Sequence, residues 1–188
     1  MDNESISIRD VRIEELDEIS LLLKEAYQQY EKLLPGDTWH RYVEDITNVR
    51  SRLDESQLIV AEVNRQLVGA VTLYLNARRS EREGWPRGWA VIRLLAVRPS
   101  CRNRGIGHAL VEECLRRCRE EGIATVGLHT TEMMDVAQRM YEKMGFTRVP
   151  EFDFYPRPDV VVMAYRLDLI TSIGNCSLEN LQRGIVTK

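Results

Sequence analysis

A basic, glycine-rich segment in the middle of the chain has the residue types of an anion-binding site. It reads RNRGIG over residues 102–107 and follows an apolar run that ends at Val97. If a helix begins at Gly105, its first backbone N–H groups have no acceptor within the helix and carry a partial positive charge. Gly105 and Gly107 would leave these groups open to a ligand, and the arginines would add charge-assisted hydrogen bonds. The segment therefore predicts a cradle for a pyrophosphate group.

Two other phosphate-binding motifs fit this segment poorly. A Walker loop needs Gly-x-x-x-x-Gly-Lys-Ser/Thr, and the sequence contains none. A dinucleotide fingerprint expects glycine or alanine where Leu110 stands, and its first glycine directly after the strand. Two alternatives to the cradle remain: a nucleotide-binding module of another kind, and an ordinary helix start beside solvated arginines.

Together with a second block, AQRMYEKMGF over residues 137–146, the segment resembles the GNAT superfamily of acetyl-CoA-dependent N-acetyltransferases. The phosphate loop of that family reads Arg/Gln-x-x-Gly-x-Gly/Ala after a central strand, and Arg102, Gly105 and Gly107 match it. The order of the expected elements fits the family over residues 6–167. The resemblance implies acetyl-CoA as cosubstrate, no metal, and transfer of the acetyl group to an amine by direct attack on the thioester.

The resemblance also implies a role for individual residues. In the family, the strand before the phosphate loop separates from its neighbour, and its backbone groups bind the pantetheine arm. Leu95, Ala96 and Val97 would lie along that arm, with one N–H polarising the thioester carbonyl. Tyr141 matches the tyrosine that protonates the leaving thiolate. The residues expected to hold the pyrophosphate are Arg102, Asn103, Arg104, Gly105, Ile106, Gly107 and His108.

The motifs do not identify the group that takes a proton from the acceptor amine. A lysine-like amine with a pKa of ~10.4 is almost fully protonated at neutral pH, so it needs a base or a water relay. Many family members carry glutamate where Val91 stands and asparagine where Met134 stands. His129, at the end of an expected strand, is the preferred base, and a hydrogen bond to a loop is its structural alternative. The other candidates are Glu83, Glu132 and Asp153.

Hydrophobic periodicity predicts the element order β-α-α-β-β-β-α-β-α-β-β. We expect helices over residues 16–30, 39–53, 105–121 and 134–144, and strands over residues 5–11, 57–63, 67–76, 89–97, 123–129, 147–154 and 160–167. The hairpins predict antiparallel pairs, and the strand–helix alternation predicts parallel pairs. The expected fold class is α/β (α+β): a single GNAT-like domain over residues 1–169, whose mixed central sheet of about seven strands has helices on both faces. Residues 170–188 would be a tail, either a short helix or disordered.

Composition narrows the class of protein further. The chain has 188 residues, of which 44% are hydrophobic and 29% charged, as expected for one soluble domain. Its net charge of −3 argues against general nucleic-acid binding. We expect no membrane partner and no secretion signal, because no segment approaches ~18 apolar residues and the N-terminus lacks an apolar region. Four cysteines without CxxC spacing indicate reduced thiols in the cytoplasm, and Cys114 and Cys118 favour helix packing over a zinc site.

The expected function is therefore an N-acetyltransferase that uses acetyl-CoA and acts on an amine of a small molecule, a peptide or a protein. A non-catalytic acetyl-CoA-binding sensor or regulatory module is the alternative, because Val91 removes a common base. A homodimer is a further expectation from the family. Candidates for lining the acceptor pocket, for which core packing or loop exposure is an equal explanation, are Arg78, Arg79, Trp85, Trp89 and Tyr155.

Overall fold

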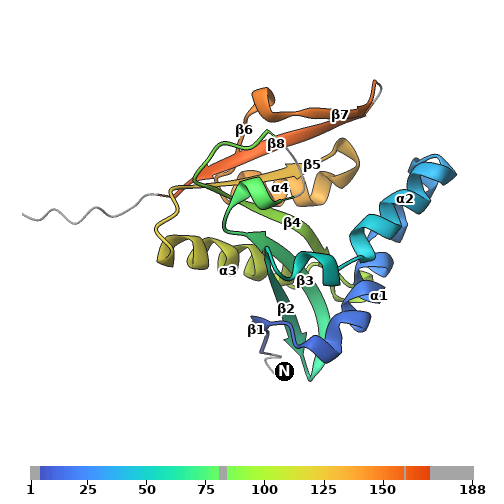
Figure 1. Cartoon of the computed structure of the whole chain (residues 1–188). Coiled ribbons are helices and arrows are strands. Elements are labelled where there is room, and N and C mark those ends of the chain that lie inside the picture. Colours follow the sequence, from blue (N-terminus) through green and yellow to red (C-terminus); the bar gives the residue numbers. More distant parts are fainter. Residues whose placement is uncertain (1–4, 81–83, 159, 170–188) are drawn as a thin grey trace, which may run out of the picture.

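The computed structural model has a mixed sheet of eight strands at its centre (Figure 1). It describes residues 5–80, 84–158 and 160–169. The strands are Ser7–Asp10 (β1), Gln57–Val63 (β2), Gln66–Tyr74 (β3), Trp89–Val97 (β4), Thr125–Thr130 (β5), Thr147–Arg148 (β6), Phe154–Arg157 (β7) and Val160–Asp168 (β8). Their order is β1-β2-β3-β4-β5-β8-β6, with β7 paired to β8. Only β4 and β5 pair in parallel among these strands.

The α-helices of the described residues cover both faces of the sheet (Figure 1). α1 and α2 pack on one face, against buried strand residues such as Val60 and Ala70. α3 and α4 pack on the other face, against Ile59 and Val71, which are the sequence neighbours of Val60 and Ala70. Successive residues of a strand point to opposite faces, so both faces of these strands are buried. The expected single domain, with a mixed sheet between helices, is confirmed. The helices are Leu16–Tyr27 (α1), Gly36–Thr47 (α2), Ile106–Glu120 (α3) and Asp135–Lys143 (α4).

The first two helices are shorter than the periodicity predicts. α1 ends at Tyr27, and the chain continues as a 3-10 helix, Gln28–Leu33, which keeps the ring of Tyr30 within 6.0 Å of the Tyr27 ring. α2 ends at Thr47, short of the expected end. The buried guanidinium of Arg52 donates hydrogen bonds to carbonyl oxygens at this end of α2. The last carbonyl oxygens of a helix lack most of their N–H donors, so the hydrogen bonds from Arg52 stabilise the helix terminus.

The prediction of one continuous strand over residues 147–154 is wrong. This segment is divided into β6 and β7 by a 3-10 turn, Pro150–Phe152. Pro150 has no backbone N–H to extend the hydrogen-bond ladder, which explains the interruption. The expected tail over residues 170–188 lies outside the described residues.

The two parallel strands of the sheet separate near their carboxyl ends. β4 and β5 pair only through residues 89–92 and 125–128, so the last residues of β4 have no partner on this side. On its other side, β4 carries a bulge where the pairing with β3 shifts between Ala70 and Thr72. Within the bulge, Leu94 has a φ of +54°, in the left-handed region that few residues other than glycine adopt. The divergence that the family resemblance implies is therefore present.

Trp85 belongs to the core, which is the packing alternative that the sequence left open for this residue. Its side chain is 7% exposed and packs in a cluster with Val91, Val149 and other residues. The ring lies directly over Gly127, where an added Cβ would be only 2.7 Å from the indole. Gly127 therefore makes room for the indole against β5.

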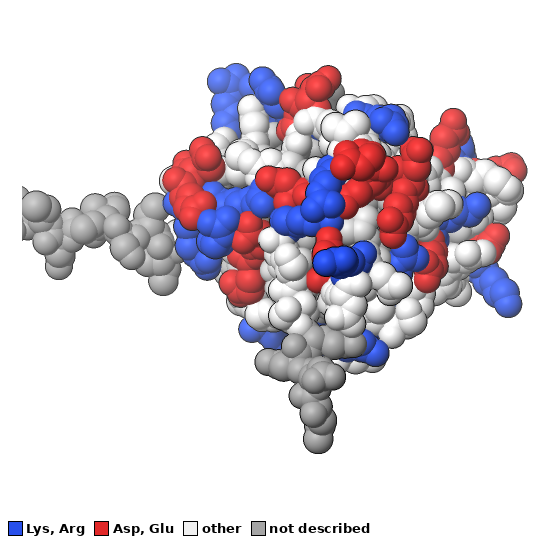
Figure 2. Space-filling model, turned by 90° about the horizontal axis from the view of Figure 1, so that it is seen from below, with Lys and Arg blue, Asp and Glu red and all other residues white. Residues whose placement is uncertain are grey.

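Charged side chains of both signs are interleaved on the face shown in Figure 2, and they form no uniformly basic surface there. Arg98, for example, pairs with Glu18 and Glu25, at 3.2 and 2.6 Å. Cys114 and Cys118, which belong to α3, are buried in the core, as the packing interpretation predicts. In the part of the chain that the structure describes, no helix has the length and apolar character to cross a membrane.

We expect Gly127→Ala to destabilise the protein by about 1–3 kcal/mol, because the new methyl group overlaps the Trp85 ring and the core must shift. Urea unfolding followed by tryptophan fluorescence measures this change. Gly36→Ala is the matched control, since a Cβ at Gly36 meets nothing within 4 Å and the residue begins α2. Equal unfolding free energies for the two variants would contradict the packing of Trp85 on Gly127.

Candidate active site

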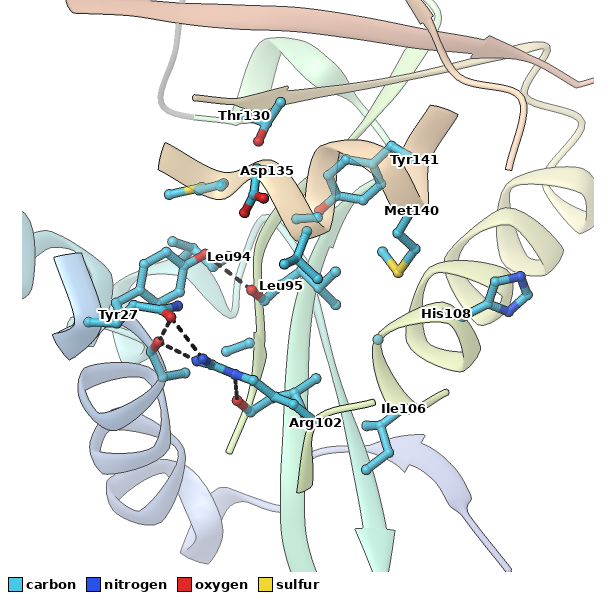
Figure 3. A pocket seen from close by; sticks show the side chains of 18 of the residues that line it. Tyr27, Leu94, Leu95, Arg102, Ile106, His108, Thr130, Asp135, Met140 and Tyr141 are labelled. Atoms are coloured by element: carbon cyan, nitrogen blue, oxygen red, sulfur yellow. Dashed lines mark hydrogen bonds between the residues drawn. The ribbon is translucent and has the colours of Figure 1, made fainter. Parts of the chain in front are cut away.

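A cavity of about 600 Å³ lies where β4 and β5 diverge (Figure 3). Its walls come from the end of β4, the loop before α3, the first turn of α3, the end of β5 and the start of α4. The structure thus gathers at one place residues that are far apart in the sequence. The predicted site residues in its lining are Leu95, Ala96, Val97, Arg102, Asn103, Gly105, Ile106, Gly107, His108, His129 and Tyr141. Arg104 is exposed and is not part of the lining.

The loop before α3 brings the start of this helix to the wall of the cavity. Asn103 and Gly105 have φ angles of +61° and +78°, and α3 begins directly after Gly105. The Ala109 N–H donates to the Gly105 carbonyl oxygen at 2.9 Å, so the N–H groups before Ala109 have no acceptor within the helix. A Cβ on Gly107 would project toward Met140, 3.6 Å from its sulfur. This is the geometry of an anion-binding helix start.

The Arg102 side chain connects this loop to α1. Its guanidinium donates to the Ala26 carbonyl at 2.8 Å, to Gln29 Oε1 at 2.9 Å and to the Val97 carbonyl at 3.4 Å (Figure 3). The side chain predicted to meet a phosphate is therefore directed at acceptors of the protein. In this arrangement Arg102 fixes the loop, and the backbone N–H groups form the cradle.

Tyr27 holds the bulged part of β4 from the other side. Its hydroxyl donates a hydrogen bond to the Leu95 carbonyl oxygen at 3.2 Å (Figure 3). Burial raises the pKa of Tyr27 well above its usual range, so it remains a donor. The periodicity of residues 16–30 alone would place Tyr27 on an apolar helix face and gives its hydroxyl no role. The polar hydroxyl on that face was the available signal.

Tyr141 extends from α4 into the cavity, toward the β4 side (Figure 3). Its side chain is 5% exposed, and its ring packs edge-on against Phe146 with the centroids 5.7 Å apart. No hydrogen bond to the hydroxyl is formed by the residues that the structure describes. Burial raises the pKa of Tyr141 above its usual range, so the hydroxyl is protonated at neutral pH. The group can therefore donate a proton within the cavity.

His129 borders the same cavity and also makes the loop contact that was its structural alternative. Its Nε2 lies 3.0 Å from the Phe152 carbonyl oxygen, and a carbonyl can only accept, so Nε2 carries a proton. The ring packs against Trp85, at 4.5 Å, and against Phe154, at 5.0 Å. These contacts hold the imidazole in one orientation at the end of β5.

The structure reduces the list of other candidate bases. Asp153 accepts hydrogen bonds from Arg148, at 2.7 and 2.8 Å, and from the Ala164 N–H. Burial alone would raise its pKa, but these bonds outweigh burial and keep the pKa below its usual value. Asp153 therefore forms an ion pair with Arg148, which makes it a poor candidate for the base. Glu132 is exposed and outside the cavity lining, and Glu83 lies outside the described residues.

A second cavity, of about 460 Å³, adjoins the first and was not expected from the sequence. Residues 92–94 of β4, with His129 and Thr130 of β5, line both cavities, so the two meet where the strands diverge. Thr130 is 2% exposed, and its hydroxyl has no hydrogen-bond partner among the residues that the structure describes. The second cavity extends from this junction to α2 and the β7–β8 hairpin.

The sequence model of the acetyltransferase (GNAT) family matches residues 16–146. The probable N-acetyltransferase camello of Xenopus laevis is 28% identical over 129 residues, which are 66% of this chain and 56% of that protein. The ribosomal protein bS18-alanine N-acetyltransferase of Escherichia coli K12 is 29% identical over 80 residues, 40% of this chain and 54% of that protein. The chain spans about half the length of these curated relatives.

Comparison with solved structures finds the same fold in N-acetyltransferases. The PaiA N-acetyltransferase of Thermoplasma acidophilum, solved in complex with coenzyme A, superposes with a TM-score of 0.66 at 19% identity. The superposition covers 85% of this chain and 98% of that one. The family match extends over more than half of the 188 residues, from α1 to the end of α4. The chain therefore belongs to the GNAT acetyltransferase family.

Proposed function

We propose that the chain is an acetyl-CoA-dependent N-acetyltransferase. The observation that carries the proposal is the 600 Å³ cavity, which joins an anion-binding helix start to a buried, protonated tyrosine at a gap in the sheet. A pyrophosphate fits the N–H groups around Gly105 and Gly107, where a side chain would take up the space. The unpaired edge of β4 at Leu95, Ala96 and Val97 offers backbone groups to a pantetheine arm.

In this reaction the amine nitrogen attacks the thioester carbon, the C–S bond breaks and the thiolate takes a proton. An N–H of the bulged strand would stabilise the oxyanion, because a fixed donor in a dry cavity needs no reorganisation. Tyr141 would supply the proton to the thiolate. His129 would accept the proton from the amine, and its ring is already oriented by Phe152. Both side chains line the cavity that would hold the thioester.

The acceptor is an amine, as the names of the two curated relatives suggest. We infer that it enters through the second cavity, which meets the first at Thr130. A domain boundary at residue 169, a cytoplasmic location and a homodimer remain predictions from the sequence.

A module that binds acetyl-CoA without turnover is the second candidate. It is favoured by Val91, which is buried in an apolar cluster and cannot accept a proton. Release of the CoA thiol with a panel of primary amines separates the two: turnover with any amine supports the transferase. Acetyl-CoA binding without turnover of any amine supports the module.

We expect acetyl-CoA at 100 times its dissociation constant to stabilise the protein by about 2.7 kcal/mol. The melting temperature would rise by roughly 5–10 °C, and ADP should give a much smaller shift. Gly107→Val should remove most of the acetyl-CoA shift, because the branched side chain projects into the cradle toward Met140. Gly36→Val, in the first turn of α2 and in the lining of neither cavity, is the control and should retain it. A full shift in Gly107→Val would exclude the cradle at this helix start.

Tyr141→Phe should lower kcat by about a hundredfold or more, since it removes the acid that protonates the thiolate. The affinity for acetyl-CoA, measured by calorimetry, should stay nearly the same because the ring and its packing are retained. Tyr155→Phe is the control, as Tyr155 is 66% exposed and lines neither cavity. An unchanged kcat in Tyr141→Phe would show that another group supplies the proton.

His129→Asn should lower kcat/KM at neutral pH by about a hundredfold. Asparagine cannot take the proton from the amine, so steady-state kinetics with the acceptor amine measures the loss. His40→Asn is the control, because His40 is an exposed histidine that contacts the Gly36 carbonyl. If His129→Asn kept the kcat/KM of the wild-type protein, His129 would have only its structural contact.

A further inference from the structure

We propose that the second cavity selects an acceptor amine that carries a carboxylate and an apolar body. This inference rests on the proposed acetyl transfer and names the class of its acceptor. The cavity has about 460 Å³, which is within the range of small-molecule sites. It is separate from the cradle but meets the first cavity at the gap between β4 and β5, where the acceptor nitrogen has to arrive.

The lining of the second cavity is mostly apolar and aromatic. Tyr30 and Leu34 come from the segment after α1, Met133 from the segment before α4, and Phe154 and Val162 from the β7–β8 hairpin. Such walls favour an acceptor with an aliphatic or aromatic body, because burying apolar surface against them is favourable. A short polar amine would leave these walls exposed to water.

The charged groups of the same lining are predominantly basic. Arg41 of α2, Arg93 of β4 and Arg157 of β7 come from three different elements, and Asp45 is the one acidic side chain among the described lining residues. Asp45 is already shared between two guanidinium groups, with Arg52 at 3.1 Å and Arg93 at 3.9 Å. The described lining therefore holds three guanidinium groups and one carboxylate, a balance that suits an anion.

Arg41 is the arginine best placed to hold that anion. Its Nε donates to the Asp37 carbonyl at 3.3 Å, and no carboxylate of the described residues pairs with it. A guanidinium binds a carboxylate with two parallel hydrogen bonds, which gives both affinity and orientation. Because Arg41 stands on α2, it can bind a carboxylate while the amine of the same molecule points toward β4 and β5.

The amine end of the acceptor would meet Thr130 at the junction of the cavities. The Thr130 hydroxyl is buried without a hydrogen-bond partner among the described residues, a cost that a bound polar group would relieve. Figure 3 shows this hydroxyl above Asp135, on the cavity side of β5. Thr130 is thus a positioning residue for the nitrogen, and the arginines select the other end of the molecule.

The test compares amines that differ only in the carboxylate: L-phenylalanine with 2-phenylethylamine, and 6-aminohexanoate with hexylamine. We expect kcat/KM to be at least tenfold higher for the carboxylate in one pair or both. Arg41→Gln and Arg157→Gln should reduce that preference about tenfold or more, since a charge-assisted contact contributes about 1.5–3 kcal/mol. Arg50→Gln is the matched control: Arg50 is an exposed arginine just beyond α2 that pairs with Asp17 and lines neither cavity.

A binding experiment makes the result independent of turnover. In the presence of CoA, calorimetry should give a higher affinity for N-acetyl-L-phenylalanine or 6-acetamidohexanoate than for N-acetyl-2-phenylethylamine or N-hexylacetamide. Arg41→Gln should remove this difference in affinity. Equal or better use of the amines without a carboxylate would overturn this inference and leave the acetyltransferase intact. Absence of turnover and of product binding across the panel would overturn it as well. In that case the acetyl-CoA shift in melting temperature decides separately whether the proposed function survives.

Discussion

The separation of β4 and β5 after four residue pairs is the constraint on which both cavities depend. Unpaired strand edges inside a protein are costly, because each backbone N–H and C=O group needs a partner. Here, contacts at the end of α1 reduce this cost, because two carbonyl groups of β4 gain hydrogen-bond donors. Tyr27 satisfies the Leu95 carbonyl, and Arg102 binds the Val97 carbonyl together with two acceptors at the end of α1. The end of α1 therefore works as a support that keeps the gap open and its remaining backbone groups available.

The two sides of the gap differ in chemical character. On the α3 side, the first cavity presents backbone N–H groups at a helix start and a buried tyrosine hydroxyl. On the α2 side, the second cavity presents aromatic rings and guanidinium groups. In the proposed reaction, acetyl-CoA and an amphipathic amine would thus approach the same strand ends from opposite directions. The reacting atoms of this proposed reaction would meet where Thr130 and His129 border both spaces.

Much of the fold was predictable from the sequence because it depends on local patterns. The periodicity of α3 and the glycine before it placed the start of this helix correctly, and the block around Tyr141 led to a residue that lines the cavity. Most of the missed features depend on contacts between distant segments. Nothing near Trp85 reveals that Gly127 makes room for it, and the arginines at 41, 93 and 157 become neighbours only through the tertiary fold. Pro150 was the exception: its effect on the last strands is local and was readable.

The wall that the two cavities share has a thermodynamic consequence. Residues 92–94 and Thr130 line both spaces, so a ligand that orders this wall from one side prepares it for a ligand on the other. Binding free energies at two such sites are coupled, and the coupling is reciprocal: whatever the thioester adds to the affinity for the amine, the amine adds to the affinity for the thioester. If the two cavities hold the two substrates of the proposed reaction, the bulged strand would thereby act as a cooperative element between them.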